Sequence, residues 1–166
     1  MEVDNGKYNL GNTEKQQATM DMESVIRKIV HEKTKDVEYI TNNIRSWLKD
    51  ETTELSDIEI EDILLQLPIV LYNSIEEQEI TGMQSDMANQ IYKEAQSEAY
   101  RLARGTIADK NAIADLQTRS QQLEKIIYDR SYKIIKQKFD LALETLNAVK
   151  KVQVGRQQRL DLTRRF

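Results

Sequence analysis

Few side chains in this sequence can act as nucleophiles, general bases or metal ligands, because it holds one histidine and no cysteine. His31 is followed by Glu32, but a zinc site on a helix needs a second histidine four residues after the first, and that position is Lys35. A di-metal carboxylate bundle needs several Glu-x-x-His motifs, which one histidine cannot supply. Glycine-rich phosphate loops and nucleophile elbows are also missing from the sequence. We therefore expect a protein that is not an enzyme and binds no metal or cofactor, with His31 as a solvated helical residue.

Lysines recur on one side of the last predicted helix. At 100° per residue, one face of residues 123–152 is apolar, and an arc of about 100° on the other side carries cations. These cations are Lys125, Lys133, Lys136, Lys150 and Lys151, with Tyr132 at the border of the arc. Lysines that follow phosphates, with an aromatic ring that can stack on a base, are typical of sequence-independent binding of single strands. Asp129 and Asp140 share the arc and could instead pair with Lys133 and Lys136 at four-residue spacing, which leaves a solvated face of ion pairs as the alternative.

The end of the chain is more strongly basic than this stripe. Its last seventeen residues contain one acid, Asp161, and end in Phe166. The cations there are Lys150, Lys151, Arg156, Arg159, Arg164 and Arg165. Unpaired basic residues near a terminus favour contact with phosphates or with an acidic protein surface.

The net charge of −4 hides two halves of opposite sign. Residues 1–90 carry 8 Lys/Arg and 19 Asp/Glu, whereas residues 91–166 carry 16 and 9; residues 50–91 contain eleven acids and no Lys or Arg. Three interpretations stay open: a solvated acidic face, an acidic block that meets the basic half of another copy, or separate partners for the two halves.

Composition predicts an all-α chain that associates with itself. One Pro, five Gly and long stretches of Glu, Gln, Lys, Ala and Leu favour helices, with two Phe and one Trp as large core fillers. Helices with so little intramolecular cover tend to pair with other subunits, so we expect an elongated, oligomeric helical bundle or hairpin with coiled-coil-like long helices. We divide the chain into a flexible arm (1–19), acidic N-terminal helices (20–67) and a long helical hairpin with a basic last helix (68–166).

The first two predicted helices are marked by their caps and by apolar spacing. Asp21 is a candidate N-cap for a helix that ends near Lys49. Its apolar face is Ile26, Val30, Val37, Ile40, Ile44 and Trp47. Ser56 and Glu59 form a capping box ahead of Ile58, Ile60, Ile63, Leu64 and Leu67. We expect this short helix to kink or restart at Leu67 and Pro68.

The densest apolar cluster follows, and we expect it at the centre of the core. It consists of Ile69, Val70, Leu71, Tyr72 and Ile75. Helical spacing continues through Ile80, Met83, Met87, Ile91, Ala95, Ala99 and Leu102. Gly105 lies where a helix would end, and Thr106 with Asp109 repeats the capping box.

Residues 107–160 would span roughly 80 Å as one helix at about 1.5 Å per residue, too long for a compact domain of this size. We expect either a break near Asp129, Arg130 and Ser131 or an arm of an intermolecular coiled coil. Its near-heptad residues favour a hairpin with the 80–104 helix or a subunit interface. These residues are Leu116, Leu123, Ile127, Ile134, Leu141, Val149 and Val152.

The N-terminal residues have no basic segment followed by an apolar run, and no apolar run is long enough to span a membrane. We therefore expect a soluble intracellular protein without a membrane partner.

Residues 70–160 resemble the phage UvsY-like recombination mediators, small helical proteins that form rings, bind single-stranded DNA and help to load a RecA-type recombinase against a single-strand binding protein. The resemblance rests on the order of elements, on Glu94-Ala95-Gln96 with Ala103-Arg104, and on Ala148-Val149-Lys150. Where that family has lysines after the Glu-Ala-Gln string, this chain has Ser97 and Glu98. The resemblance therefore implies DNA contacts at that helix for Lys93, Arg101 and Arg104 only, and a cytoplasmic location in a bacterial host.

We thus predict a non-enzymatic, homo-oligomeric accessory factor of DNA recombination or replication, which binds single-stranded DNA and a recombinase or single-strand binding protein. The alternative is a phage structural, scaffold or assembly protein whose acidic and basic halves mediate self-assembly. The predicted nucleic-acid contacts are Lys93, Arg101, Arg104, Lys125, Tyr132, Lys133, Lys136, Lys150, Lys151, Arg156, Arg159, Arg164 and Arg165.

Overall fold

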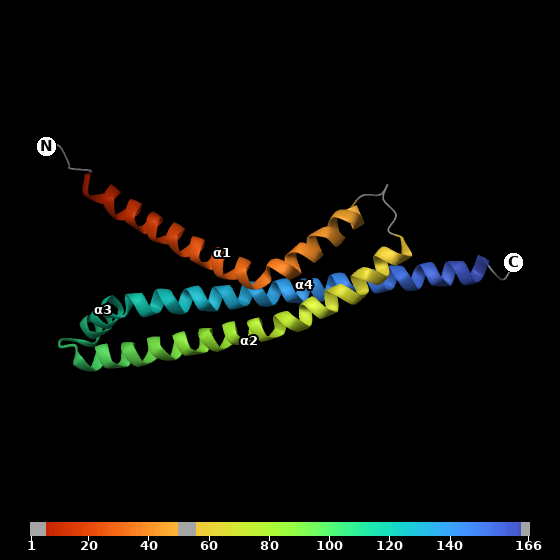
Figure 1. The fold of residues 1–166 in the computed structure, drawn as a ribbon. Helices are drawn as coiled ribbons and strands as arrows, with labels where there is room; N and C mark the ends of the chain where they lie inside the picture. The colour runs from red at the N-terminus through yellow and green to blue at the C-terminus, as the bar shows by residue number, and fades with distance from the viewer. Residues whose placement is uncertain (1–5, 50–55, 164–166) are drawn as a thin grey trace. The chain divides into compact units, whose positions relative to one another are not determined.

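The computed structural model describes residues 6–49 and 56–163, with side chains described for 20–47 and 56–162. These residues form four α-helices, and the described part of the chain contains no β-strand (Figure 1). The helices are α1 (Gly6–Lys49), α2 (Asp57–Leu102), α3 (Ile107–Gln117) and α4 (Arg119–Thr163). The prediction of an all-α fold is confirmed.

The chain forms two compact units, each built from segments that are distant in the sequence. Unit 1 comprises Met1–His31 and Thr81–Tyr132, and unit 2 comprises Glu32–Ile80 and Lys133–Phe166. This division differs from the predicted consecutive segments that meet at residues 19 and 67. Helices α1, α2 and α4 each contribute one part to unit 1 and the other part to unit 2.

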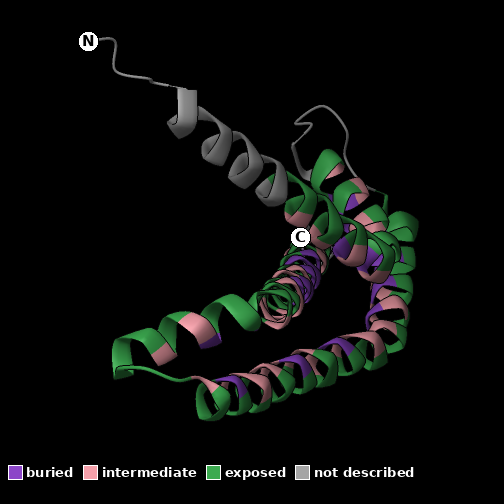
Figure 2. Cartoon of the chain, turned by 90° about the vertical axis from the view of Figure 1, so that its left-hand side faces the viewer, coloured by how far each residue is buried: buried purple, intermediate pink, exposed green. Residues whose placement is uncertain are grey.

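Unit 2 has a core of large aliphatic side chains from three helices. Buried positions recur every three or four residues along the helices, as the purple bands in Figure 2 show. The core consists of Val37 and Ile44 from α1, Ile60, Ile63, Leu67 and Leu71 from α2, and Ile135, Phe139, Ala142, Leu146 and Val149 from α4. Each fully buried Leu, Ile or Phe stabilises the fold by about 1.5–3 kcal/mol relative to exposure. Two ion pairs join the same helices, Lys33 with Glu77 and Lys138 with Glu38.

Unit 1 is built from smaller side chains. Its buried apolar residues are Val30, Ala88, Ala99 and Ala114, and its buried polar residues are Thr81, Thr118 and Ser131. Gly82 of α2 lies against the ring of Tyr132, and a Cβ at that glycine would be 3.2 Å from Tyr132 Cε2. Small residues therefore let the helices of this unit approach closely.

The first helix agrees with its predicted apolar face and C-terminus. Val30, Val37 and Ile44 are buried, and α1 ends at the predicted Lys49. The helix begins at Gly6, so the prediction of an N-cap at Asp21 is wrong, and residues 6–19 are helical instead of a non-helical arm.

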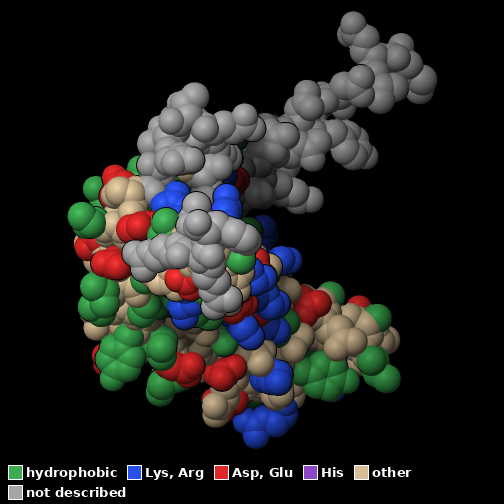
Figure 3. Space-filling view, turned by 90° about the vertical axis from the view of Figure 1, so that its right-hand side faces the viewer, with side chains coloured by type: hydrophobic (Ala, Val, Ile, Leu, Met, Phe, Trp, Pro, Cys, Tyr) green, Lys and Arg blue, Asp and Glu red, His purple; other side chains and the backbone are tan. Residues whose placement is uncertain are grey.

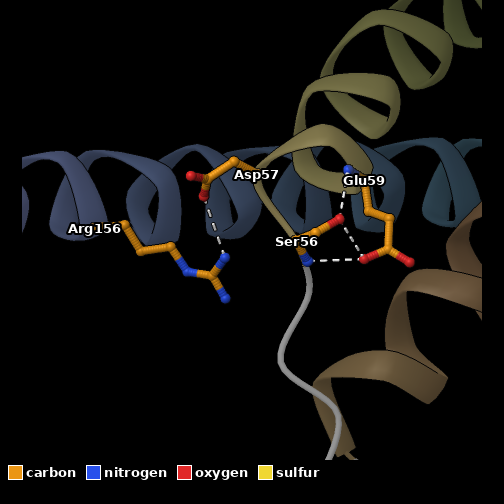
Figure 4. Close-up of polar contacts among 4 residues, drawn as sticks. All are labelled: Ser56, Asp57, Glu59 and Arg156. Atoms are coloured by element: carbon orange, nitrogen blue, oxygen red, sulfur yellow. Dashed lines mark hydrogen bonds and ion pairs between the residues drawn. The ribbon is translucent and has the colours of Figure 1, made fainter.

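Both predicted capping boxes are present. The Ser56 N–H donates to Glu59 Oε2 (2.7 Å), and the Glu59 N–H donates to Ser56 Oγ (3.3 Å), as the close-up shows (Figure 4). At the start of α3, the Thr106 N–H donates to Asp109 Oδ2 (3.0 Å) and the Asp109 N–H donates to Thr106 Oγ1 (3.3 Å). Gly105 adopts φ +118°, a conformation that L side chains rarely adopt, just after α2 ends.

The restart predicted at Pro68 is wrong, because Pro68 lies inside α2, which continues to Leu102. The kink given as its alternative stays a prediction. A proline removes one backbone hydrogen bond, a penalty of about 3 kcal/mol. Leu67 and Leu71, one on each side of it, are buried in the core of unit 2, and their packing offsets that penalty.

The prediction that residues 69–75 form the centre of the core is also wrong. Of that cluster only Leu71 is buried, whereas Ile69, Tyr72 and Ile75 are 59%, 77% and 54% exposed. Helix α2 is apolar on two sides, and the buried side is the one that carries Ile60, Ile63, Leu67 and Leu71. Farther along α2, Ala99 is buried as predicted, but Ile80, Met83, Met87, Ile91 and Leu102 are exposed.

The break in the long C-terminal segment occurs at Thr118, not near residues 129–131. Helix α3 ends at Gln117 and α4 begins at Arg119, and the N–H and Oγ1 of the intervening Thr118 both donate to the carbonyl of Ala114. Helix α4 then runs without interruption through Ser131, which is fully buried.

The predicted heptad face of this segment is displaced in the structure. Of its seven residues only Val149 is buried, while Leu116, Leu123, Leu141 and Val152 are exposed. The buried face of α4 instead contains Ser131, Ile135, Phe139, Ala142, Thr145, Leu146 and Val149. Two of these positions carry hydroxyl side chains, so a prediction based on apolar residues alone does not identify this face.

Candidate nucleic-acid interface

The side of α4 that faces away from the core of unit 2 carries lysines. At 100° per residue, Lys133 and Lys151 fall opposite the buried Ile135 and Ala142, and Lys136 falls on the flank of the helix, about 100° from Ile135. All three are exposed, as is Lys150 beside them. Within the described part of the chain, Lys136, Lys150 and Lys151 form no ion pair. Their ammonium groups are therefore available to an external anion.

Two carboxylates lie on the same side of α4. Asp140 and Glu144 are exposed between the lysine pairs 133/136 and 150/151. Over residues 133–162 the sequence holds seven Lys/Arg and three Asp/Glu, so this half of α4 is basic in spite of them. Its positive charge is concentrated at the two ends of that stretch.

Part of the positive charge at the end of α4 is neutralised by an ion pair. Arg156 is half-buried, and its Nη1 donates to Asp57 Oδ1 at 3.5 Å, beside the first capping box (Figure 4). The Arg159 Nε donates to the carbonyl of Gly155 (3.4 Å) within the helix. Arg164 and Arg165 lie outside the described residues. The acidic start of α2 therefore neutralises one of the predicted contacts, Arg156, within the same chain.

The three residues carried over from the resemblance lie in unit 1. Lys93 and Arg101 line an open depression of about 610 Å³ on α2 together with Glu94, Ser97 and Glu98. Arg104 follows the helix and is exposed. The two glutamates beside the two cations leave this surface without net charge, so it attracts a phosphate less than the lysine side of α4 does.

Lys125 and Tyr132, the two remaining predicted nucleic-acid contacts, touch other residues of unit 1. The Lys125 ammonium lies 4.9 Å from the centre of the Tyr92 ring, a cation–π contact that leaves Lys125 half-buried. Tyr132 is also half-buried, and its ring packs on Gly82. A ring in this position has one part of its surface covered and stacks less readily on a base.

Sequence reasoning missed the neighbours of these two residues. Tyr92 and Gly82 are more than thirty positions away from Lys125 and Tyr132, so no local spacing pairs them. A glycine inside a helix is the one signal available. It destabilises the helix by about 1 kcal/mol relative to alanine, so its presence indicates that another group approaches the backbone closely there.

The described residues offer little for catalysis. They contain no cluster of three or more His, Asp or Glu side chains arranged to hold a metal ion. His31 is exposed on α1. The described helices also lack any segment that is both long and apolar enough to cross a bilayer.

Two carboxyl pKa values are displaced, and both belong to helix caps. Hydrogen bonds from the Ser56 backbone and hydroxyl lower the pKa of Glu59 below its ordinary value of 4.5. Hydrogen bonds from the hydroxyl and backbone of Thr106 lower the pKa of Asp109 below 3.8. Both carboxylates stabilise the start of a helix, so the hydrogen bonds of the helix caps account for these lowered pKa values without a reactive centre.

Comparison with protein-family models, curated protein sequences and solved structures finds no match to this chain. Its function must therefore be argued from the charges and surfaces described above.

Proposed function

We propose that this protein is a non-enzymatic accessory factor of DNA recombination or replication that binds single-stranded DNA along α4. The observation that carries the proposal is the basic side of residues 133–162, on which Lys136, Lys150 and Lys151 are exposed and form no ion pair within the described chain. A RecA-type recombinase or a single-strand binding protein is the proposed protein partner, in line with the resemblance to UvsY-like mediators.

Binding would draw its free energy from the release of counterions by the strand. Each lysine that neutralises a phosphate frees condensed cations, and the resulting attraction does not depend on base sequence. A few lysines on one helix bind weakly, but several copies joined in one oligomer raise the effective concentration of the remaining contacts once the first has formed. The strand is then held firmly overall and exchanged locally, as loading of a recombinase requires.

The test is a titration of a fluorescent oligothymidylate with the full chain at rising salt. The logarithm of affinity should fall linearly with the logarithm of salt concentration, with a slope of about −0.7 per neutralised phosphate. Lys150→Gln with Lys151→Gln should flatten that slope by about 1.4 and weaken binding at low salt.

The matched control is Lys35→Gln with Arg45→Gln, which removes the same charge from exposed positions of α1 in the same unit. It should leave the slope unchanged. An equal loss in both variants would mean that the oligonucleotide responds to net charge alone, and the assignment to α4 would fail.

A structural or assembly protein is the second candidate, and the exposed apolar side of α2 favours it. Ile58, Leu65, Ile69 and Tyr72 stand out from unit 2 without cover. Large exposed apolar patches mark sites of protein association. A stable oligomer that binds no oligonucleotide even at low salt would identify this second function.

A further inference from the structure

The first half of α2 presents two apolar faces. Its inner face is buried in unit 2 through Ile60, Ile63, Leu67 and Leu71. Its outer face repeats the same three- and four-residue spacing with Ile58 (78% exposed), Leu65 (67%), Ile69 (59%) and Tyr72 (77%). A helix on the surface of a protein normally turns polar residues outward, so the outer face indicates a second helix that covers it.

The charge of this outer face disfavours a second copy of α2 as its cover. Asp62 and Glu76 continue the line of the outer apolar residues, at the four-residue steps that follow Ile58 and Tyr72. No Lys or Arg occurs in residues 50–91. Two such faces packed together would bring acidic residues near one another with no cation to balance them, which destabilises the contact. A basic helix is the complementary cover.

The end of α4 has the complementary character. One edge of it, at spacings of four and three, consists of Ala148, Val152, Gly155, Arg159 and Leu162. Val152 and Leu162 are 38% and 58% exposed, and no side chain of residues 157–162 is buried. Between residues 150 and 162 the helix carries four cations and one acid. Figure 3 shows exposed hydrophobic and acidic side chains side by side on one flank of the molecule and Lys and Arg gathered next to it.

Gly155 gives this edge its strongest indication of a partner. A glycine within a helix is unfavourable by about 1 kcal/mol relative to alanine. At Gly82 the neighbouring Tyr132 ring explains the glycine, but a Cβ built at Gly155 meets no atom within 4 Å. Nothing in the described chain requires a glycine there, whereas a large side chain from another molecule would.

We propose that the outer face of α2 in one copy binds the end of α4 of a second copy, in antiparallel direction. With Asp62 opposite Arg159, the same register sets Ile69 against Val152. It also sets Leu65 against Gly155, Tyr72 against Ala148 and Ile58 against Leu162. Leu65 and Tyr72 then meet the small Gly155 and Ala148, the other two pairs join aliphatic side chains, and the charged pair fixes the register.

The two surfaces differ, so when two copies bind, one copy keeps the end of its α4 unoccupied and the other keeps the outer face of its α2 unoccupied. Such head-to-tail contacts continue from copy to copy and close into a ring or extend as a filament. This inference rests on the self-association that the proposed function requires, and it identifies the two surfaces through which the copies associate. The lysine side of α4, with Lys136 and Lys150, stays outside the contact and open to a strand.

Disulfide trapping tests the register directly, because the chain has no cysteine of its own. A full-length chain with both Ile69→Cys and Val152→Cys should form a ladder of covalent multimers under mild oxidation on a non-reducing gel. An equal mixture of the two single variants should form a dimer. Tyr39→Cys mixed with Val152→Cys is the control, since Tyr39 is 70% exposed on another helix of the same unit.

Three results would overturn the proposal. The first is cross-linking of Ile69→Cys alone with the same yield as the mixture, which means a symmetric α2 pair. The second is an equal yield in the Tyr39→Cys control, which means random collision. Lastly, a chain that is monomeric by light scattering at low salt has no such contact at all.

A second experiment measures the mass of the oligomer. Ile69→Glu should lower the mass measured by light scattering to that of a monomer, with an unchanged circular dichroism spectrum because the residue is exposed, while Tyr39→Glu should leave the mass unchanged. Binding of a short oligothymidylate separates this inference from the proposed function. Intact DNA binding without cross-links leaves the function and removes the interface; cross-links without DNA binding do the reverse.

Discussion

The two units of this protein bury different kinds of side chain. The buried apolar residues of unit 2 are mostly Leu, Ile, Val and Phe from three helices, whereas those of unit 1 are one valine and three alanines; each unit also buries three hydroxyl residues. Apolar burial stabilises by about 25 cal/mol per Å², so a core of alanines contributes much less than one of leucines and isoleucines. We infer that unit 2 holds most of the stability of the fold and that unit 1 opens at a lower free energy.

The comparison also separates two kinds of surface. In unit 2 the cations of α4 are exposed, and three of them form no ion pair in the described chain. In unit 1 the cations Lys110 and Lys125 lie over tyrosine rings, and the α2 depression that Lys93 and Arg101 line also holds glutamates. The exposed, unpaired lysines of residues 133–162 favour unit 2 as the site of polyanion binding.

The largest expected effect lies in the core of unit 2. Leu67→Ala removes a fully buried side chain from the middle of that core and should lower the free energy of unfolding by about 2–5 kcal/mol. The matched change in unit 1, Ala88→Gly, should lower it by about 1 kcal/mol. Urea denaturation followed by circular dichroism measures both. Equal losses would show that the two units contribute equally, and the comparison would be wrong.

A smaller effect of opposite sign is expected in unit 1. Ser131 is fully buried in α4, and its Oγ has no hydrogen-bond partner. A buried hydroxyl without a partner is unfavourable by about 1–3 kcal/mol, and alanine is also the better helix former. Ser131→Ala should therefore raise the free energy of unfolding by about 1 kcal/mol or more.

Thr145→Ala provides the contrast in unit 2. The Thr145 hydroxyl donates to the carbonyl of Leu141 (2.8 Å), and its methyl group lies in the core. This substitution should destabilise the protein in the same urea experiment. If Ser131→Ala also destabilised it, the Ser131 hydroxyl would have a partner in solution.

Local chemistry was predictable from the sequence, whereas the choice of buried face was not. Both capping boxes and Gly105 depend on residues a few positions apart, so their patterns settle their structures. The buried faces of α2 and α4 depend on which of two apolar sides meets a distant helix. Thr34, Thr41, Thr81, Thr118, Ser131 and Thr145 are all buried, and an apolar count does not include them.

The candidate site, too, was predictable from the sequence only in part. The exposure of the lysines on α4 follows from their position opposite the apolar side, which the sequence shows. The positions of Lys125 and Tyr132 follow from contacts with Tyr92 and Gly82, and the pairing of Arg156 follows from contact with Asp57. Those partners come from other helices, and only the folded chain brings them together.

The smallest expected effect compares the two capping boxes as pH falls. Glu59 begins α2 in unit 2 and Asp109 begins α3 in unit 1, and each carboxylate accepts a backbone N–H in its ionised form. The folded pKa of each lies below its ordinary value, 4.5 for Glu59 and 3.8 for Asp109. Each carboxylate therefore stabilises the fold fully above that ordinary value, and the contribution is lost as pH falls through the folded pKa.

Glu59→Gln and Asp109→Asn should each destabilise the protein at pH 7 by a small amount, and the difference from the unaltered chain should shrink on acidification. The difference for Glu59→Gln should begin to shrink near pH 4.5 and that for Asp109→Asn near pH 3.8, because those are the pKa values of the unfolded chain. Urea denaturation at a series of pH values measures both differences. A difference that stays constant from pH 7 to pH 3 would show that the cap is held by its neutral hydrogen bonds, and the two units would then share one response to acid.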